Sequence, residues 1–334
     1  MPQFRKDPVA DRWVIIASER AQRPGHHRGD GDRARASAAP CPFCAGNEAM
    51  TPPEVWAQRE NNTLADAPGW QVRVVPNKYP ALENKGDWMA VKNGIYESSN
   101  GLGVHEVIIE SPDHAINMGT LGLDQFAKVL RAYRERMRAL RADSRWRYLM
   151  LYKNQGEPAG ATLEHVHSQL VALPSVPREA ADELNGTEKH YDSTGSCVYC
   201  DIVQREVESG ERLVSNTERF VALCPFAPRF GYEIWILPKN HAAAFEQNTE
   251  EDILALALTL KDSIARLNHV LNDPPFNYVI HSAPAPELAR PHYHWHIEIM
   301  PQLTRAAGFE WGSGTFMNSI APEDAAGSLR NATI

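Results

Sequence analysis

An internal repeat constrains the fold more than any other feature of this sequence, because the two halves present the same signals in the same order. Each half begins with a Cys-x-x-Cys pair, which is Cys41/Cys44 in the first half and Cys197/Cys200 in the second. A β-rich run ending in a histidine, a long amphipathic stretch, a short apolar run and a His-x-His motif follow each pair. A series of signals that recurs in this way indicates one supersecondary unit used twice. We therefore expect a duplicated fold.

Hydrophobic periodicity predicts the elements of the two units. Apolar residues at helical spacing predict amphipathic helices over Asp124–Ala142 and Glu250–Leu271, and Thr249 precedes the second helix as a suitable N-cap. Each helix is followed by a predicted strand, which covers residues 148–153 in the first half and 277–281 in the second. Both units thus have the same order of elements.

Each half also supplies two cysteines and two histidines, which are ligands that zinc prefers. Cys-x-x-Cys can be a redox motif instead, but two such pairs in a chain with 13 histidines favour metal binding. Because protein side chains fill all four positions of a tetrahedral shell, we predict two structural zinc sites. Their ligands are Cys41, Cys44, His114 and His165 in the first half, and Cys197, Cys200, His241 and His294 in the second. The competing histidines are His105 for His114, and His292 and His296 for His294. The two ligand histidines are 51 residues apart in the first half and 53 in the second.

The motif that begins at His165 places three polar side chains on alternate residues. Alternate residues of a strand share one face, so His165, His167 and Gln169 are expected to point the same way. Two imidazoles and an amide on one face suit phosphate chemistry, with one ring binding a metal and the other acting as a nucleophile. A polar strand face with ordinary surface histidines is the alternative. The second half has Glu298 at the position that matches Gln169.

Length and charge narrow the class of protein. At 334 residues the chain exceeds the usual size of a single core, and we divide it into a half of residues 1–172, a linker of residues 173–196 and a half of residues 197–334. The net charge of −8 argues against nucleic acid as a partner. The apolar runs are shorter than the roughly 20 residues of a membrane span, and the first residues do not resemble a signal sequence. We expect a cytoplasmic protein without a membrane partner.

Two segments are candidates for binding a phosphorylated substrate. Residues 154–162 are a small-residue stretch with two glycines, a backbone that can approach a diphosphate closely or simply form a turn. Arg20 and Arg23 follow a predicted strand near the N-terminus and are candidate phosphate clamps, and solvated arginines are the alternative.

The sequence resembles the galactose-1-phosphate uridylyltransferase family, a branch of the histidine-triad superfamily, over nearly the whole chain. The residues that carry the resemblance are Cys41-x-x-Cys44, Ser111-Pro-Asp-His114, Asn154 with its glycine-rich loop, and His165-x-His167-Ser-Gln169. The resemblance implies an α+β fold of two histidine-triad-like units, with two mainly antiparallel sheets and flanking helices. It also implies stabilisation by zinc and assembly as a homodimer.

The same resemblance implies a mechanism. His167 would attack the α-phosphorus of a nucleotide sugar, expel a hexose 1-phosphate and pass the nucleotidyl group to a second acceptor in a ping-pong reaction. The backbone carbonyl beside His167 would fix the tautomer of the ring. Gln169 stands where hydrolases of the superfamily carry a third histidine, which favours transfer over hydrolysis. The substrate-binding residues of the family match Arg20, Arg23, Asn77, Asn154 and Thr162.

One segment departs from the uridylyltransferase pattern. Residues 308–318 lack the family's hexose-contacting Tyr-Glu pair and look more like the ADP-glucose phosphorylase branch, in which inorganic phosphate is the acceptor. Our first expectation is uridylyl transfer from UDP-glucose to a hexose 1-phosphate, with galactose 1-phosphate as the default acceptor. ADP-glucose phosphorolysis through the same histidine is the second. A non-catalytic, zinc-stabilised nucleotide-binding module is the third.

Overall fold

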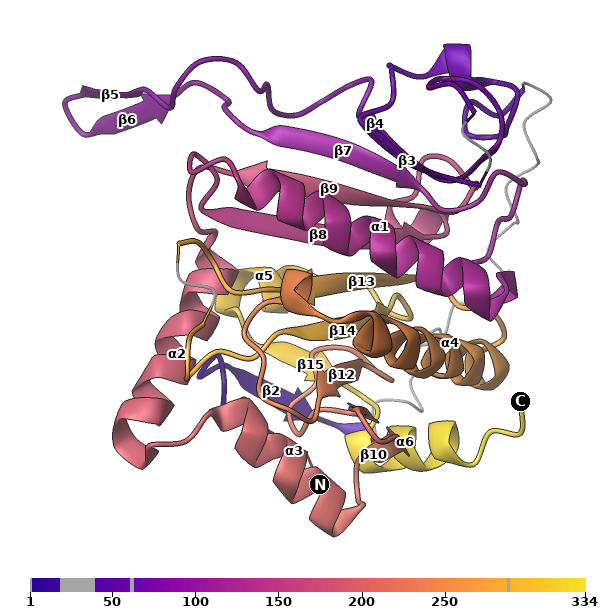
Figure 1. The fold of residues 1–334 in the computed structure, drawn as a ribbon. Coiled ribbons are helices and arrows are strands. Elements are labelled where there is room, and N and C mark those ends of the chain that lie inside the picture. Colours follow the sequence, from indigo (N-terminus) through magenta and orange to yellow (C-terminus); the bar gives the residue numbers. More distant parts are fainter. Residues whose placement is uncertain (1, 19–39, 61–62, 287–288) are drawn as a thin grey trace.

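The computed structural model describes residues 2–18, 40–60, 63–286 and 289–334, and its centre is a ten-stranded sheet (Figure 1). From its outer edge inwards, the first half contributes β3 (Trp56–Arg59), β4 (Trp70–Pro76), β7 (Val104–Ile109), β9 (His167–Leu173) and β8 (Tyr148–Gln155). In the matching order, the second half contributes β10 (Leu213–Asn216), β11 (Phe220–Leu223), β12 (Ile234–Pro238), β14 (His296–Pro301) and β13 (Phe276–His281). All neighbouring strands of this sheet are antiparallel.

The two half-sheets meet at β8 and β13. These strands pair from Phe276 opposite Gln155 to Ile280 opposite Leu151. The α+β class and the antiparallel sheets are confirmed, with the difference that the two predicted sheets join edge to edge. Pairing the innermost strands gives hydrogen-bond partners to backbone groups that would otherwise line two sheet edges.

Two long helices, α1 (Leu123–Arg141) and α4 (Glu250–Leu271), lie side by side across one face of the sheet (Figure 1). The predicted range of α1 was displaced by one residue and that of α4 is the observed one. Thr249 caps α4 through a capping box with Asp252, as its sequence position predicts. Apolar side chains of both helices and of both half-sheets form one continuous core. The halves are therefore joined by packing as well as by strand pairing.

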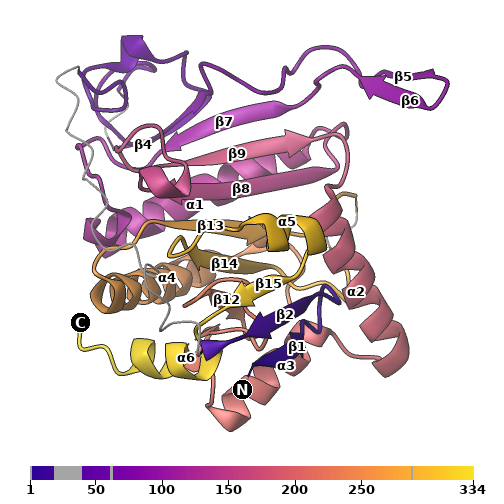
Figure 2. The same cartoon turned by 180° about the vertical axis from the view of Figure 1, so that it is seen from behind.

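The other elements lie mainly around the second half. β1 (Gln3–Lys6) and β2 (Trp13–Ile16) form a small sheet with β15 (Phe316–Asn318), beside α5 (Gly308–Ser313) (Figure 2). The N-terminal strands thus lie with the C-terminal half. The expected linker contains a helix, α2 (Arg178–Thr194), and α3 (Val198–Ser209) and α6 (Pro322–Arg330) come later in the chain. A hairpin of β5 (Ala90–Asn93) and β6 (Tyr96–Ser99) projects from the first half.

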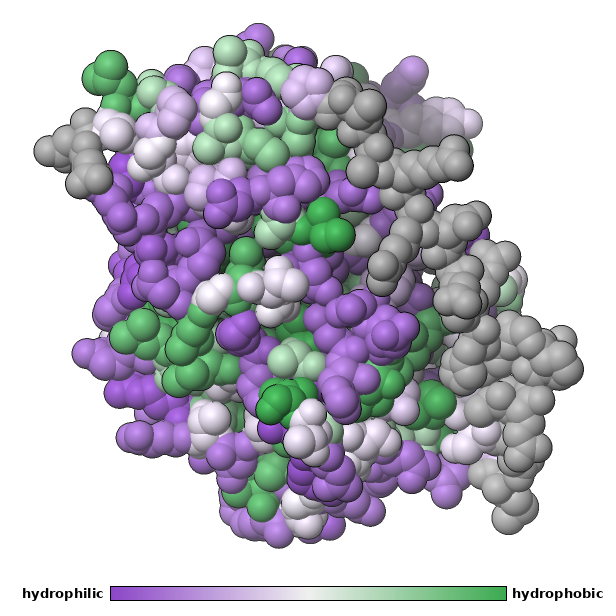
Figure 3. All heavy atoms as spheres, turned by 90° about the vertical axis from the view of Figure 1, so that its right-hand side faces the viewer, coloured by the Kyte–Doolittle hydropathy of each residue, from purple (hydrophilic) through white to green (hydrophobic). Residues whose placement is uncertain are grey.

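β9 begins at the right-hand side of Figure 1, the side that faces the viewer in Figure 3. Hydrophilic and hydrophobic residues are interspersed over this face. Within the described parts of the chain, none of the helices has the length and apolar character needed to cross a membrane.

Candidate active site and metal centres

The first Cys/His cluster lies where the Cys41–Cys44 loop meets the start of β9. The Nδ1 atom of His165 is 3.6 Å from the Sγ atoms of both cysteines, and Nδ1 of His114 is 3.3 Å from Cys44 Sγ. His165 is fully buried, and its Nε2–H donates to the carbonyl oxygen of Ser111 at 2.9 Å. That bond turns Nδ1 towards the sulfur atoms. The four side chains predicted for this half could therefore hold a metal ion.

The second cluster repeats this arrangement at the start of α3. Cys200 Sγ lies 3.5 Å from Nδ1 of both His241 and His294, and Cys197 completes the group. The Nε2–H groups of the two rings donate to backbone carbonyls at 3.0 Å, of Arg290 and Pro238 respectively. A backbone partner on the far nitrogen fixes the ring orientation, as is usual for metal-binding histidines.

The competing histidines lie elsewhere. His105 lies against Gln169, and His296 stacks on His281. His292 meets the second cluster through its backbone, because its carbonyl accepts from the Cys197 thiol at 3.5 Å. The geometry thus selects His114 and His294 from the alternatives that the sequence left open.

His167 begins β9 beside the first cluster, and one of its ring nitrogens is engaged. Its Nδ1–H donates to the carbonyl oxygen of His165 at 2.7 Å, which directs the lone pair of Nε2 away from the backbone. Phe43, from the cysteine loop, packs edge-on against the ring with centroids 5.3 Å apart. Burial lowers the pKa of His167, and the charge of Lys153 lowers it further. A neutral, oriented imidazole of this kind is suited to nucleophilic attack.

A buried polar network, which sequence reasoning missed, supports β9 from behind. The Lys153 ammonium donates to the Glu110 carboxylate at 2.6 Å and to the His167 carbonyl oxygen at 3.0 Å. Glu110 also accepts from Tyr133 at 2.8 Å and from Ser168. Both members of the ion pair are almost fully buried. Each charge is paired, as buried charges must be, so the backbone at His167 is held rigidly.

Gln169 shares the face of the sheet that carries His167 and forms a polar row with two residues of neighbouring strands. Its Oε1 atom is 2.8 Å from Nε2 of His105, and Asn77 Nδ2 is 3.2 Å from the same nitrogen. Asn77 follows β4, and its backbone N–H donates to the His105 carbonyl oxygen at 2.8 Å. The structure therefore brings Asn77 to the site, as the resemblance implies, and adds His105.

Asn154 and the loop after it border the same region. The Asn154 side-chain oxygen accepts from Asn277 at 2.8 Å, so the amide is held from the second half. Gly156 and Gly160 have φ values of +84° and +93°, which favour glycine at both positions. Thr162 is exposed in this loop. Arg20 and Arg23 lie outside the described residues.

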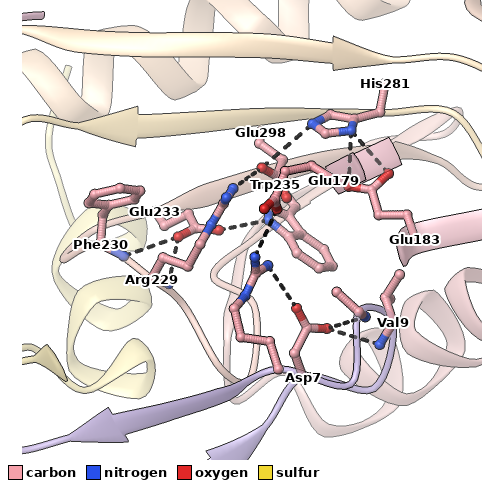
Figure 4. A network of polar contacts seen from close by, with 12 residues as sticks. Asp7, Val9, Glu179, Glu183, Arg229, Phe230, Glu233, Trp235, His281 and Glu298 are labelled. Carbon is pink, nitrogen blue, oxygen red and sulfur yellow. Dashed lines mark hydrogen bonds and ion pairs between the residues drawn. The ribbon is translucent and has the colours of Figure 1, made fainter. Parts of the chain in front are cut away.

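The second half has a counterpart of the active site, but its side chains are buried and paired with one another; we call it the closed site. The register places His281 opposite His296, and their rings stack with centroids 4.5 Å apart. His296 is fully buried, and burial lowers its pKa to about 4. Nδ1 of His281 lies 3.0 Å from Glu183, and Arg229 pairs with Glu298 (Figure 4). Glu183, His281, His296 and Glu298 are a third group that could hold a metal ion.

The charges of this network compensate one another. Burial opposes a charged His281, but the two carboxylates beside it raise its pKa to about 10. Burial likewise opposes a charged Glu298, yet Arg229 and His281 hold its pKa below the ordinary range. The result is an interior salt-bridge network instead of an accessible site.

Sequence comparisons match this chain over its whole length. The family model for the galactose-1-phosphate uridyl transferase N-terminal domain matches residues 1–177, and a domain of unknown function, DUF4921, matches residues 103–332. An ADP-glucose phosphorylase of Arabidopsis thaliana is 35% identical, covering 100% of this chain and 93% of that protein. A galactose-1-phosphate uridylyltransferase of Thermotoga maritima is 28% identical, covering 100% and 99% respectively.

Solved structures agree with these matches. The crystal structure of the Arabidopsis thaliana ADP-glucose phosphorylase with bound ADP-glucose superposes with a TM-score of 0.85 at 34% identity, covering 100% of both chains. A uridylyltransferase structure gives a TM-score of 0.77 at 29% identity, covering 99% of this chain and 97% of the other. The fold and the chain length are thus shared with both kinds of enzyme.

Proposed function

The chain belongs to the galactose-1-phosphate uridyl transferase family of nucleotidyltransferases, and on that premise we propose that it cleaves ADP-glucose with inorganic phosphate through His167. The fixed orientation of the His167 ring supports this chemistry. Its Nδ1–H donates to the His165 carbonyl oxygen, and Nε2 is directed away from the backbone. The observation that favours adenine is the higher similarity to the ADP-glucose phosphorylase than to the compared uridylyltransferases.

In the first step, Nε2 of His167 attacks the α-phosphorus of the nucleotide sugar. A P–N bond forms while the bond from the α-phosphorus to the bridging oxygen breaks, and glucose 1-phosphate leaves with that electron pair. The ring gains positive charge, which the carbonyl oxygen of His165 stabilises through the Nδ1–H bond. In the second step, an oxygen of inorganic phosphate attacks the same phosphorus. A P–O bond forms while the P–N bond breaks, so ADP leaves and the electron pair of the broken bond returns to Nε2, which restores the neutral ring.

Gln169 explains why the acceptor is phosphate and not water. Its amide can donate N–H groups to a phosphoryl oxygen, but it cannot remove a proton from water. The nucleotidyl-histidine should therefore persist until a phosphate or sugar phosphate arrives. Asn154 and Asn77 lie at the same site, and we assign Asn154 to the phosphates and Asn77 to the nucleoside. From the family pattern we also assign Arg20, Arg23 and Thr162 to substrate binding.

We assign zinc to the two Cys₂His₂ clusters. A tetrahedral zinc with ordinary Zn–S and Zn–N bonds holds sulfur and nitrogen ligand atoms about 3.6 Å apart, and the sulfur–nitrogen separations in the two clusters are 3.3–3.6 Å. The donor set and spacing fit. Bound zinc would supply structural stability, tying the cysteine loop to His165 and so to the strand that carries His167. Metal analysis should find two zinc ions per chain; a single zinc would refute the assignment of one cluster.

Uridylyl transfer between hexose 1-phosphates is the second candidate function. It is favoured by the match of residues 1–177 to the uridyl transferase domain and by 28% identity over the whole chain to the Thermotoga maritima enzyme. Under either function we also propose a homodimer, as the family resemblance implies, and a cytoplasmic location.

One labelling assay distinguishes the two functions. The protein is incubated with ADP-glucose or UDP-glucose carrying label in the α-phosphate, quenched in alkali and counted. We expect stable label from ADP-glucose, release of labelled ADP when phosphate is added, and no label on His167→Asn. Label from UDP-glucose alone, released by galactose 1-phosphate, would favour the second function. No label from either nucleotide sugar would refute both functions, and the non-catalytic nucleotide-binding module would be the remaining hypothesis.

A further inference from the structure

A histidine that this mechanism does not use holds Gln169 from one side. We propose that His105 is a positioning residue, which fixes the Gln169 amide with its N–H groups turned towards the reacting phosphoryl group. The inference deepens the proposed function and rests on it, because it assigns how the residue beside the nucleophile is oriented.

The register of the sheet puts both side chains on the face that carries the nucleophile. Val107 of β7 lies opposite Gln169 of β9, and Ile109 lies opposite His167. His105 is two residues from Val107, so its side chain shares that face and reaches Gln169 diagonally. His105 is half-buried, and its Nε2 atom lies 2.8 Å from Gln169 Oε1.

The contacts of the other ring nitrogen decide which end of the amide His105 meets. The backbone N–H of Ala81 donates to Nδ1 of His105 at 3.5 Å, so we assign the ring proton to Nε2. Nε2–H then donates to the side-chain oxygen of Gln169. In this tautomer Nε2 does not accept from Asn77 Nδ2, 3.2 Å away, and the Asn77 amide is held through its oxygen, which accepts from the backbone N–H of Tyr79 at 2.9 Å.

The orientation matters because a side-chain amide has a donor end and an acceptor end of nearly the same shape. Turned one way, Gln169 offers N–H groups to the anionic oxygens of the phosphoryl group. Turned the other way, it presents an oxygen that repels them. A donor that engages the oxygen end selects the first orientation, and preorganised donors contribute most when they need not reorient during the reaction.

A metal-binding role for His105 does not account for its position. The first cluster is complete with Cys41, Cys44, His114 and His165, and His105 is not a member of it. Removing the imidazole should therefore leave the zinc content unchanged, which separates a positioning role from a structural one.

The test is a double-mutant cycle on the rate at which nucleotide sugar labels the protein. The variants are His105→Leu, Gln169→Leu and the double variant, each checked for zinc content and thermal midpoint. We expect His105→Leu to slow labelling about tenfold to hundredfold while the KM for nucleotide sugar stays within about twofold. In the Gln169→Leu background, the same His105→Leu change should lower the labelling rate by less than about twofold. His105→Gln, whose amide N–H can replace Nε2–H, should recover most of the rate.

Equal slowing in both backgrounds would mean that His105 acts through packing and would overturn the proposal, as would an unchanged rate in His105→Leu. If His105→Leu does not fold, His105→Asn takes its place in the cycle, because its shorter side chain cannot reach Gln169. A wild-type protein that neither ADP-glucose nor UDP-glucose labels refutes the proposed function and this inference together. A labelled wild type with an equally fast His105→Leu variant refutes the inference alone.

Discussion

In the first half, His167 lies at the start of β9 with Nε2 directed away from the backbone, whereas in the second half the matching His296 is fully buried between the rings of Tyr199 and His281. The residues just before them are alike: His165 and His294 both direct Nδ1 to a Cys-x-x-Cys pair. The Cys/His cluster is thus present in both halves, while the strand that follows it differs between them. A fold can duplicate a structural site without duplicating its chemistry.

The residue two places further along separates the halves most clearly. Gln169 is neutral, half-buried and in contact with His105, whereas Glu298 is buried and paired with Arg229. A carboxylate at the first position would repel a phosphate, and an unpaired carboxylate at the second would destabilise the core. A carboxylate therefore suits only the second position, where Arg229 pairs with it. Exchanging these residues or removing their partners tests the comparison.

The largest effect is expected when the two matching histidines are removed in turn. His167→Asn should lower nucleotidyl transfer by at least about 10⁴-fold, because the nucleophile is lost. His296→Asn should leave the turnover of folded protein within about threefold of wild type, since that ring is buried and does not reach substrate. Steady-state rates, normalised to zinc content, measure both. Comparable losses in the two variants would break the distinction between the halves.

The next largest effect concerns the closed site. Arg229→Met should lower the free energy of unfolding by about 3–5 kcal/mol, because it removes the main counter-charge of the buried Glu298. Arg219→Met is the matched control: its ion pair with Asp252 is partly exposed, and its loss should cost less than about 1 kcal/mol. Urea denaturation of both variants gives the two values. Equal destabilisation of the two variants would show that Arg229 stabilises the protein no more than the partly exposed Arg219 does.

Gln169→Glu introduces the acidic residue of the second half into the active site. We expect transfer to fall about 10²-fold, because the carboxylate repels the phosphoryl oxygens and has no N–H to donate. Glu298→Gln, the reverse exchange, should leave the transfer rate of the folded protein unchanged. Initial rates at saturating nucleotide sugar provide the measurement. Wild-type activity in Gln169→Glu would remove the role assigned to the amide.

Per unit of pH, the pH dependence of stability gives the smallest of these effects. The pKa of His281, about 10, is raised above its ordinary value near 6.5. Its ion pairs therefore stabilise the protein fully below about pH 6.5, and this stabilisation is lost as the pH rises towards 10. Between about pH 7 and 10, the free energy of unfolding of wild type should fall by up to about 1.4 kcal/mol per pH unit more steeply than that of His281→Gln. Parallel curves would contradict a charged His281.

Much of this arrangement could be predicted from the sequence, because metal ligands and helices leave regular signals. The spacing of Cys, Cys, His and His predicted the members of both clusters, and apolar periodicity with the Thr249 cap predicted α4 within its observed bounds. The union of the half-sheets could not be predicted, since β8 and β13 show the same apolar pattern whether they pair with each other or lie at an edge.

The missed parts of the site depend on contacts that are distant in sequence. His105 meets Gln169, 64 residues away, and Lys153 meets Glu110, 43 residues away. A histidine in a strand and a lysine in an apolar run have no local pattern that indicates their partners. The helix in the expected linker was different, because Pro177 before it and Gly195 after it were available as signals of its ends.

The decisive measurement is the position of the nucleotidyl group on the protein. The wild type is incubated with ADP-glucose without phosphate, quenched in alkali and digested, and the modified peptide is sequenced by mass spectrometry. We expect one AMP group per chain, attached to His167, with His296 unmodified. An AMP group on His296, or on any residue other than His167, would contradict the division of labour between the two halves.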